Sequence, residues 1–270
     1  MKIVTHQPCA DTNGKLTGYL NEPIMEMENR REGFPAVVVC PGGGYRMISK
    51  RESDPVALRY LAAGYQVFIL EYSIGGDAAN FNPLRELSES IAWIRENSKE
   101  FAVQEESIAV CGFSAGGHLA ASSATLWNNP RFYEKSRDFQ GRNKPNAVIL
   151  SYAVMVADKF AHSDSISNVS GSQPGSEEYE FFSLDKHVGE HTPPAFIWHT
   201  VEDGAVPVEN ALAMMCALQK AGISYEAHIF PKGNHGISVC TNEVGSFDPY
   251  NARWMDMSIQ WLGKIFSYVQ

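Results

Sequence analysis

A serine flanked by glycines is the first feature of the chain that could carry chemistry. Gly112-Phe113-Ser114-Ala115-Gly116 follows an apolar run and precedes a segment with helical character. A serine on a tight turn between a strand and a helix adopts strained backbone geometry, so its neighbours must be small. Its hydroxyl then lies at a helix N-terminus, where developing negative charge is stabilised. This pattern arises by chance in about one chain in ten of such composition, but its strand and helix context favours Ser114 as a nucleophile.

Two later residues have the types that a nucleophilic serine needs as partners. Asp203 follows the apolar run 195–199 and precedes a helical segment, so a helix-capping aspartate is the alternative interpretation. His235 lies in a glycine-flanked loop after the run 224–230. A lone loop histidine is commonly only solvated, but this one lies where a general base would be needed. The order Ser114, Asp203, His235 matches a known order of serine triads, with each residue after a predicted late strand.

Three consecutive glycines, in Pro41-Gly42-Gly43-Gly44-Tyr45, directly follow the apolar run 36–40. Without Cβ atoms the backbone can turn its amides toward a ligand, as the stabilisation of a tetrahedral oxyanion requires. Taken alone, the glycines are equally consistent with a flexible turn after a strand. The serine turn elsewhere in the chain favours the first interpretation. Tyr45 and Phe113 are candidates for lining an acyl pocket, although packing alone explains them equally well.

A competing metal-site interpretation rests on His187-Val188-Gly189-Glu190-His191, which matches the His-x-x-Glu-His pattern of some zinc proteases. That pattern needs a helix that aligns both histidines, whereas Gly189 interrupts this segment and two prolines follow it. The five cysteines are odd in number and form no Cys-x-x-Cys pair, which disfavours both zinc and disulfides. We therefore expect no metal and no cofactor.

Short apolar runs bounded by turn residues alternate with amphipathic segments along the chain. The strand-like runs are residues 36–40, 66–71, 107–112, 147–152, 195–199 and 224–230, and helical segments begin at Asp54, Asn82, Pro207 and about Ala252. Such alternation predicts an α/β fold with a mostly parallel, doubly wound sheet, because parallel neighbours require long right-handed crossovers. These sheets carry their sites at the carboxyl ends of strands. The more polar residues 15–20 and 24–29 are expected to form an antiparallel hairpin at the N-terminal edge.

Length and composition restrict the class of protein. With 270 residues, 44% of them hydrophobic and 20% charged, the chain can bury a sizeable core, and we expect one domain over residues 1–270. A net charge of −9 without a basic stripe argues against nucleic acid and anionic membranes as partners. The first residues lack a signal-peptide pattern and no apolar run is long enough to span a bilayer, so we expect a cytoplasmic protein. The sequence leaves open whether the protein forms a homo-oligomer.

Residues 157–191 interrupt the alternation of strands and helices. They are polar and rich in chain breakers, and they lie between two predicted strands. Two interpretations remain open for this segment. It is either a long surface excursion or a lid over the pocket, since loops of this length without regular structure are often functional.

Four motifs together resemble the α/β-hydrolase superfamily. They are Pro-Gly-Gly-Gly-Tyr from residue 41, Gly-Phe-Ser-Ala-Gly-Gly-His from residue 112, His-Thr-Val-Glu-Asp-Gly-Ala-Val-Pro from residue 199 and Phe-Pro-Lys-Gly-Asn-His-Gly from residue 230. Within that superfamily the chain resembles bacterial acetyl-xylan and feruloyl esterases related to the hormone-sensitive-lipase group. The resemblance implies Ser114 as nucleophile, Asp203 as acid and His235 as base. It also implies an oxyanion hole made by the amides of Ala115 and of Gly43 or Gly44.

The chemistry that this resemblance implies is acyl transfer through a covalent intermediate on the serine, followed by hydrolysis. A small-ester or carbohydrate-acetyl esterase is the leading hypothesis, with acetylated xylo-oligosaccharides as candidate substrates. A peptidase or acyltransferase on the same three residues, and a non-catalytic binding protein of this fold, remain as alternatives. Many relatives have a histidine where this chain has Pro41, so the choice between Gly43 and Gly44 stays open.

Overall fold

The computed structural model describes residues 1–24, 26 and 33–268, and its strands form one eight-stranded sheet. In chain order the strands are β1 (Lys2–His6), β2 (Lys15–Leu20), β3 (Phe34–Cys40), β4 (Gln66–Glu71), β5 (Val103–Phe113), β6 (Ala147–Ser151), β7 (Ala195–Thr200) and β8 (Tyr225–Phe230). Their order in the sheet is β1-β2-β4-β3-β5-β6-β7-β8. Only the pairs β1 with β2 and β2 with β4 are antiparallel. The predicted mostly parallel sheet with an antiparallel N-terminal edge is confirmed.

The antiparallel edge is built differently from the predicted hairpin. Residues 15–20 do form a strand, but the partners of this strand are β1 and β4. The expected second arm, residues 24–29, lies for the most part outside the described residues. Along β2, Leu16 and Leu20 are buried while the residues between them include more exposed positions, the pattern of a strand covered on one face.

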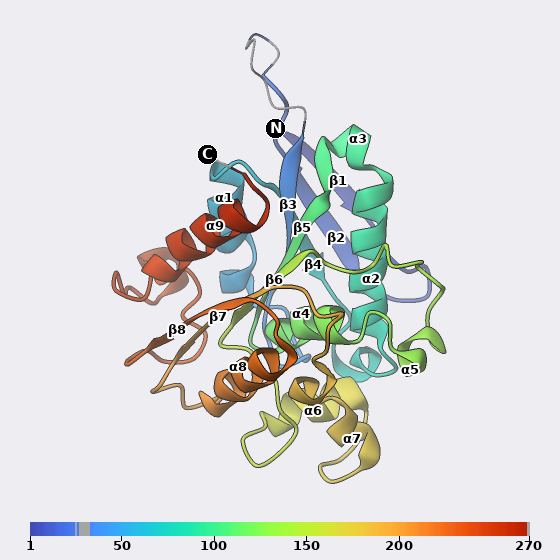
Figure 1. The fold of residues 1–270 in the computed structure, drawn as a ribbon, viewed down its shortest axis with the longest axis vertical. Helices are drawn as coiled ribbons and strands as arrows, with labels where there is room; N and C mark the ends of the chain where they lie inside the picture. The colour runs from blue at the N-terminus through green and yellow to red at the C-terminus, as the bar shows by residue number, and fades with distance from the viewer. Residues whose placement is uncertain (25, 27–32, 269–270) are drawn as a thin grey trace.

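Helices cover both faces of the sheet (Figure 1). On one face lie α1 (Asp54–Ala62) and α9 (Arg253–Ile265), and on the other lie α2 (Asn82–Glu96), α4 (Ala115–Thr125) and α8 (Glu209–Ala221). Within β3, Val37 and Val39 belong to the core under α1 and α9, whereas Val38 and Cys40 belong to the opposite core. Successive strand residues point to opposite faces, so a strand covered on both sides needs an unbroken apolar run.

The four predicted helices are found as α1, α2, α8 and α9, each beginning within two residues of the expected start. At the end of α8, Gly222 takes the left-handed conformation, with φ 70°, that commonly closes a helix. Shorter elements of the described chain include α3 (Ser98–Phe101), α5 (Pro130–Tyr133), and the 3₁₀ helices η1 (Lys50–Glu52), η2 (Gly75–Ala78) and η4 (Asn242–Val244).

Residues 157–191 contain regular structure that their polar sequence did not predict. Two short helices and a 3₁₀ helix follow one another there: α6 (Ser163–Ser170), α7 (Glu177–Phe181) and η3 (Leu184–His187). The side chains of His162 and Ser176 cap the two α-helices by accepting backbone N–H groups. Ile166 and Val169 are buried in the core below them. Helices this short are not stable by propensity alone, so capping and tertiary packing determine whether they form.

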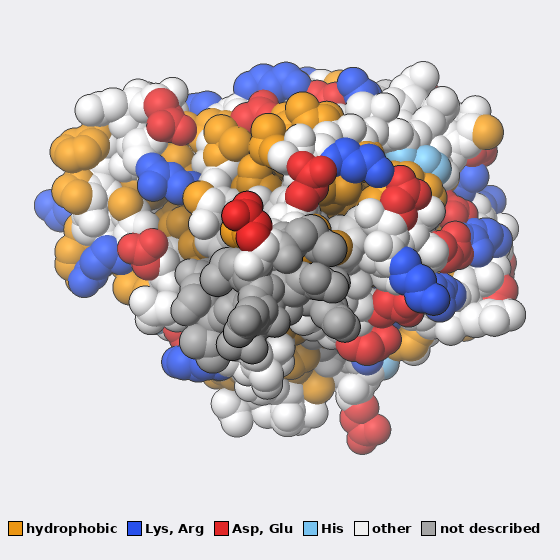
Figure 2. Space-filling model, turned by 90° about the horizontal axis from the view of Figure 1, so that it is seen from above, with side chains coloured by type: hydrophobic (Ala, Val, Ile, Leu, Met, Phe, Trp, Pro, Cys, Tyr) orange, Lys and Arg blue, Asp and Glu red, His pale blue; other side chains and the backbone are white. Residues whose placement is uncertain are grey.

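Charges of both signs are interspersed on the face of the molecule seen from above (Figure 2). Surface ion pairs among the described residues include Arg137 with Glu89 at 2.8 Å and Lys2 with Glu100 at 2.7 Å. Exposed pairs of this kind contribute little to stability. In the part of the chain that the structure describes, none of the helices combines the length and apolar character required to cross a membrane.

Candidate active site

Ser114 lies on the sharp turn between β5 and α4, where the strand ends. Its backbone has φ 52° and ψ −119°, a conformation that costs a non-glycine residue about 1–3 kcal/mol. A Cβ at Gly112 would lie 2.1 Å from the carbonyl oxygen of Gly116, and a Cβ at Gly116 would lie 2.1 Å from that of Cys40. The N–H of Ser114 donates to the carbonyl of Ser151 (3.0 Å) and helps to hold the turn. The predicted strand, turn and helix are confirmed. The backbone segments approach so closely at Gly112 and Gly116 that neither position has room for a Cβ.

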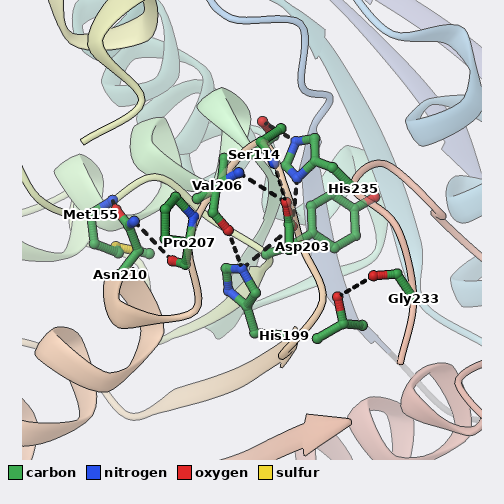
Figure 3. A network of polar contacts seen from close by, with 12 residues as sticks. Ser114, Met155, His199, Asp203, Val206, Pro207, Asn210, Gly233 and His235 are labelled. Atoms are coloured by element: carbon green, nitrogen blue, oxygen red, sulfur yellow. Dashed lines mark hydrogen bonds and ion pairs between the residues drawn. The ribbon is translucent and has the colours of Figure 1, made fainter. Parts of the chain in front are cut away.

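Asp203 and His235 reach Ser114 from the loops after β7 and β8 (Figure 3). His235 Nε2 lies 2.8 Å from Ser114 Oγ, and His235 Nδ1 lies 2.7 Å from Asp203 Oδ2. An ionised carboxylate only accepts hydrogen bonds, so the network assigns the proton to Nδ1 and leaves Nε2 able to accept one from the serine. The helix-cap interpretation of Asp203 is wrong, because Val208 is the N-cap of α8 and no side chain of the described residues caps that helix.

Asp203 is held in its ionised form by its surroundings. Its Oδ1 accepts the backbone N–H groups of Ala205 (3.0 Å) and Val206 (2.9 Å), and its Oδ2 lies 3.4 Å from His199 Nε2. Burial disfavours the charge, but the hydrogen bonds from His199 and His235 outweigh burial and keep the pKa of Asp203 well below its usual value. The carboxylate therefore stays charged when a proton arrives on His235.

The glycine loop after β3 carries free backbone N–H groups next to the serine. A Cβ at Gly42 would lie 3.0 Å from Ser114 Cβ, so the loop and the serine are in contact. The N–H of Gly42 is already used, because it donates to Glu52 Oε2 at 2.8 Å. The N–H groups of Gly43 and Gly44 have no acceptor among the described residues. These two amides are available to an anion, and Gly42 is not.

Hydrogen bonds from two directions hold this loop. The carbonyl of Gly43 accepts the N–H of Met47 (3.1 Å), and the carbonyl of Gly44 accepts Asn168 Nδ2 (2.8 Å) from α6. Gly43 has φ 129°, and a Cβ there would lie 2.0 Å from the carbonyl oxygen of Met47, so only glycine fits. Ala115 is the first residue of α4, and its N–H therefore has no acceptor within the helix. The structure thus offers the predicted amides without distinguishing Gly43 from Gly44.

Comparison with known proteins shows which family shares these motifs. A sequence model of the BD-FAE family matches residues 23–218. The chain belongs to the BD-FAE family. It is 35% identical over 237 residues to the endo-1,4-beta-xylanase B of Butyrivibrio fibrisolvens and 29% identical over 238 residues to the acetylxylan esterase of Xylanibacter ruminicola. Each match covers 85% of this chain but only 36% and 45% of those longer relatives, so the chain spans less than half of their length.

A solved structure shares the architecture of this BD-FAE member along its whole length. It is the crystal structure of an acetyl ester-xyloside bifunctional hydrolase from Caldicellulosiruptor lactoaceticus, with a TM-score of 0.81 and 30% identity. The match covers 98% of this chain and 92% of that one. A second solved structure, of an α/β hydrolase enzyme from a Medee basin deep-sea metagenome library, has a TM-score of 0.80 and 31% identity and covers 99% of this chain and 98% of that one. The predicted α/β-hydrolase fold is confirmed.

Two aromatic residues of the BD-FAE chain require a correction. Tyr45 and Phe113 were expected to line an acyl pocket, but both side chains are fully buried. The Tyr45 hydroxyl lies 2.9 Å from His118 Nδ1, and the Phe113 ring packs edge-on against Trp254 of α9, with 5.8 Å between ring centroids. Packing, the alternative interpretation, accounts for both residues.

His199 belongs to the site of this BD-FAE protein, although no catalytic role was predicted for it. It is fully buried in β7, and its Nε2 lies 2.9 Å from the carbonyl oxygen of Val206 and 3.4 Å from Asp203 Oδ2. Both neighbours are acceptors, so Nε2 carries a proton that ties the strand to the loop beyond it. In Figure 3 the Asp203 carboxylate lies between His199 and His235. The spacing of four residues between His199 and Asp203 was the only local sign of this contact in the sequence.

The two histidines of the His-x-x-Glu-His motif in this BD-FAE chain contact different parts of the protein. His187 Nε2 lies 2.7 Å from the carbonyl oxygen of Phe181, and His191 Nε2 lies 3.0 Å from that of Thr125. No helix aligns the two rings, because η3 ends at His187. Over residues 1–24, 26 and 33–268, no group of three or more His, Cys, Asp or Glu side chains is placed to hold a metal ion.

Proposed function

We propose that this protein is a serine carboxylesterase that removes short acyl groups, above all acetyl, through an acyl-enzyme on Ser114. The observation that carries this proposal is the hydrogen-bonded chain from Asp203 through His235 to Ser114, on a strained turn at the start of a helix. A serine hydroxyl is a weak nucleophile by itself, and an adjacent base held by a third group activates it. The free amides of the glycine loop supply the second requirement, a place for negative charge.

In the first half-reaction His235 Nε2 accepts the proton of Ser114 while Oγ attacks the carbonyl carbon of the ester. The carbonyl oxygen becomes an oxyanion, which the N–H of Ala115 and the free amides of the glycine loop stabilise. The protonated His235 then gives its proton to the leaving alcohol oxygen as the bond to the acyl carbon breaks. Asp203 remains ionised and stabilises the imidazolium through Nδ1, in keeping with its lowered pKa.

In the second half-reaction water takes the place of the alcohol. His235 accepts a proton from the water as its oxygen adds to the acyl carbon, and the same amides stabilise the second oxyanion. Collapse of this intermediate breaks the bond to Ser114 Oγ, which regains the proton from His235. The products are the carboxylic acid and the free serine.

Acetylated carbohydrates are the substrate class that we propose. The acetylxylan esterase and the acetyl ester-xyloside hydrolase among the similar proteins carry such substrates in their names. In this chain α6 brings a polar side chain to the loop: Asn168 is partly exposed, and its Nδ2 donates to the Gly44 carbonyl. Burial, and then the nearby His235, lower the pKa of His162, which caps α6. A polar wall of this kind favours an alcohol rich in hydroxyl groups and gives residues 157–191 the role of a lid.

Hydrolysis of p-nitrophenyl acetate, butyrate and octanoate tests the proposal. We expect the acetate to be preferred and Ser114→Ala to lose about 10³-fold or more in kcat/KM while remaining folded. Ser224→Ala is the control, because Ser224 is an exposed serine outside the site. Activity of Ser114→Ala at the wild-type rate would reject Ser114 as the nucleophile.

Release of acetate from short acetylated xylo-oligosaccharides tests the substrate class separately. No release, with p-nitrophenyl acetate still hydrolysed, would reject the carbohydrate assignment and leave the esterase. A fluorophosphonate probe that labels Ser114 in a protein inactive on every ester would point to a peptidase or acyltransferase. A protein that neither hydrolyses esters nor reacts with the probe would be a binding protein.

A further inference from the structure

Glu52 is a buried carboxylate beside the reacting groups that the mechanism above leaves unused. It ends η1 and is only 2% exposed. Within the described residues it has no cationic partner, and its hydrogen bonds come from the N–H of Gly42 to Oε2 (2.8 Å) and from the hydroxyl of Tyr152 to Oε1 (2.7 Å). A buried acidic group is costly unless its oxygens are satisfied, so these two partners are what allow it to remain there.

One of the two hydrogen bonds leads to the glycine loop. Gly42 directly precedes Gly43 and Gly44, whose amides are free. A Cβ at Gly42 would lie 2.6 Å from Glu52 Oε2 and 3.0 Å from Ser114 Cβ, so the carboxylate, the loop and the nucleophile are in close contact. Peptide groups are planar, so this hydrogen bond fixes the plane of the Pro41–Gly42 peptide, from which the chain continues into the two free amides.

The other hydrogen bond leads to the histidine. The Tyr152 hydroxyl donates to Glu52 and accepts the N–H of Ser238 (3.0 Å), in the loop that carries His235. The Tyr152 ring packs edge-on against the His235 imidazole, with 5.0 Å between centroids. Burial, and then the nearby Glu52, raise the pKa of Tyr152 well above its usual value, so the phenol keeps its proton. Tyr152 thus supports both the ring and the backbone of the base.

We propose that Glu52 is a positioning residue that aligns the glycine loop and the His235 imidazole with respect to each other. A single carboxylate holds the peptide just before the oxyanion-binding amides and, through Tyr152, the wall behind His235. The inference rests on the proposed esterase function and concerns the same site. Glu52 acts through other groups, so its loss should slow the chemical step and leave substrate affinity nearly unchanged.

Glu52→Gln tests this role because an amide has one acceptor and one donor group where the carboxylate has two acceptors. The glutamine oxygen can accept from Gly42 or from Tyr152 but not from both, so one of these two donors loses its acceptor. With p-nitrophenyl acetate we expect kcat to fall about 30-fold, less than the roughly 10²–10³-fold loss for removal of a whole oxyanion donor. KM should change by less than about threefold.

Glu86→Gln is the matched control. Glu86 is a fully buried carboxylate in α2 that accepts the N–H groups of Gly14 (3.0 Å) and Ser73 (2.7 Å), and among the described residues it has no hydrogen bond to the glycine loop or to His235. Both variants lose an acidic group that binds a backbone amide, so urea unfolding compares their structural costs directly. Folded Glu86→Gln should keep kcat within about threefold of the wild type.

A folded Glu52→Gln variant with the wild-type kcat would overturn the positioning role. If Glu52→Gln does not fold, Tyr152→Phe carries the test, since it removes one hydroxyl: we expect kcat to fall about tenfold at constant KM, and an unchanged kcat would overturn the proposal. Ser114→Ala distinguishes a failure of the proposed esterase function from a failure of the proposed role of Glu52. An active Ser114→Ala variant rejects the esterase function itself, whereas an inactive one beside an unimpaired Glu52→Gln rejects only the role of Glu52.

Discussion

Replacing Asp203 by asparagine tests how the site sets the tautomer of His235. Asparagine has nearly the same shape as aspartate but carries an NH₂ donor in place of one acceptor. Asp203 Oδ1 accepts two backbone N–H groups, from Ala205 (3.0 Å) and Val206 (2.9 Å), so the asparagine oxygen must stay on that side. Its NH₂ group then faces His235 Nδ1, which lies 2.7 Å from Oδ2 in the present structure.

That orientation makes Nδ1 an acceptor and moves the imidazole proton to Nε2, which faces Ser114 at 2.8 Å. A protonated Nε2 of the neutral ring cannot accept the serine proton. The same change in a serine protease lowers kcat about 10⁴-fold, which corresponds to about 5 kcal/mol of transition-state stabilisation. We therefore expect Asp203→Asn to lose about 10³–10⁴-fold in kcat/KM.

Steady-state hydrolysis of p-nitrophenyl acetate measures this loss, and thermal unfolding shows whether the variant is folded. Glu202→Gln is the control, because Glu202 is the adjacent acidic residue and is exposed. It should behave as the wild type. If folded Asp203→Asn stayed within about tenfold of the wild-type kcat/KM, the reasoning on the tautomer would be refuted.

Gly116→Ala should strongly destabilise the fold, because the new Cβ would lie 2.1 Å from a backbone carbonyl oxygen. The control is Gly204→Ala, whose Cβ would have no atom within 4 Å. A Gly116→Ala variant with the thermal stability of the wild type would contradict this expectation. Lowering the pH from 6.5 to 4 should cost up to about 3 kcal/mol of stability through His118, since burial lowers its pKa to about 4 while the unfolded chain takes up the proton near 6.5. In urea unfolding His118→Gln should lose less over this range; an equal loss in both proteins would exclude His118 as the cause. Asn168→Ala should lower kcat/KM several-fold, because it removes the 2.8 Å hydrogen bond to the Gly44 carbonyl, and an unchanged kcat/KM would show that the loop does not depend on α6.

Features that depend on neighbours in the chain could be predicted from the sequence. The turn at Ser114 needs glycine at positions 112 and 116 because strand and helix backbones approach within contact there. The ends of α8 follow from a proline before it and from Gly222 after it. The buried strands follow from unbroken apolar runs, since a strand covered on both faces has no exposed side.

Predictions were wrong where a residue's surroundings come from a distant element. Phe113 is next to Ser114 in the chain, yet its ring packs against Trp254 from the last helix and is closed off from solvent. The short helices α6 and α7 have polar sequences and are held by caps and by Ile166 and Val169 in the core. A local pattern contains no information about such partners, because burial is a property of the assembled layers.

The sequence by itself determined the parts of the site: a serine on a strained turn, an acid and a base in loops after later strands, and a glycine loop after an early strand. Each of these requirements is local, so residue types and spacing express them. Only the tertiary structure decided that the ends of β3, β5, β7 and β8 lie at one edge, with Glu52 bonded to Tyr152 across 100 residues of chain. That arrangement depends on the strand order and on packing between layers, which act between residues far apart in the sequence.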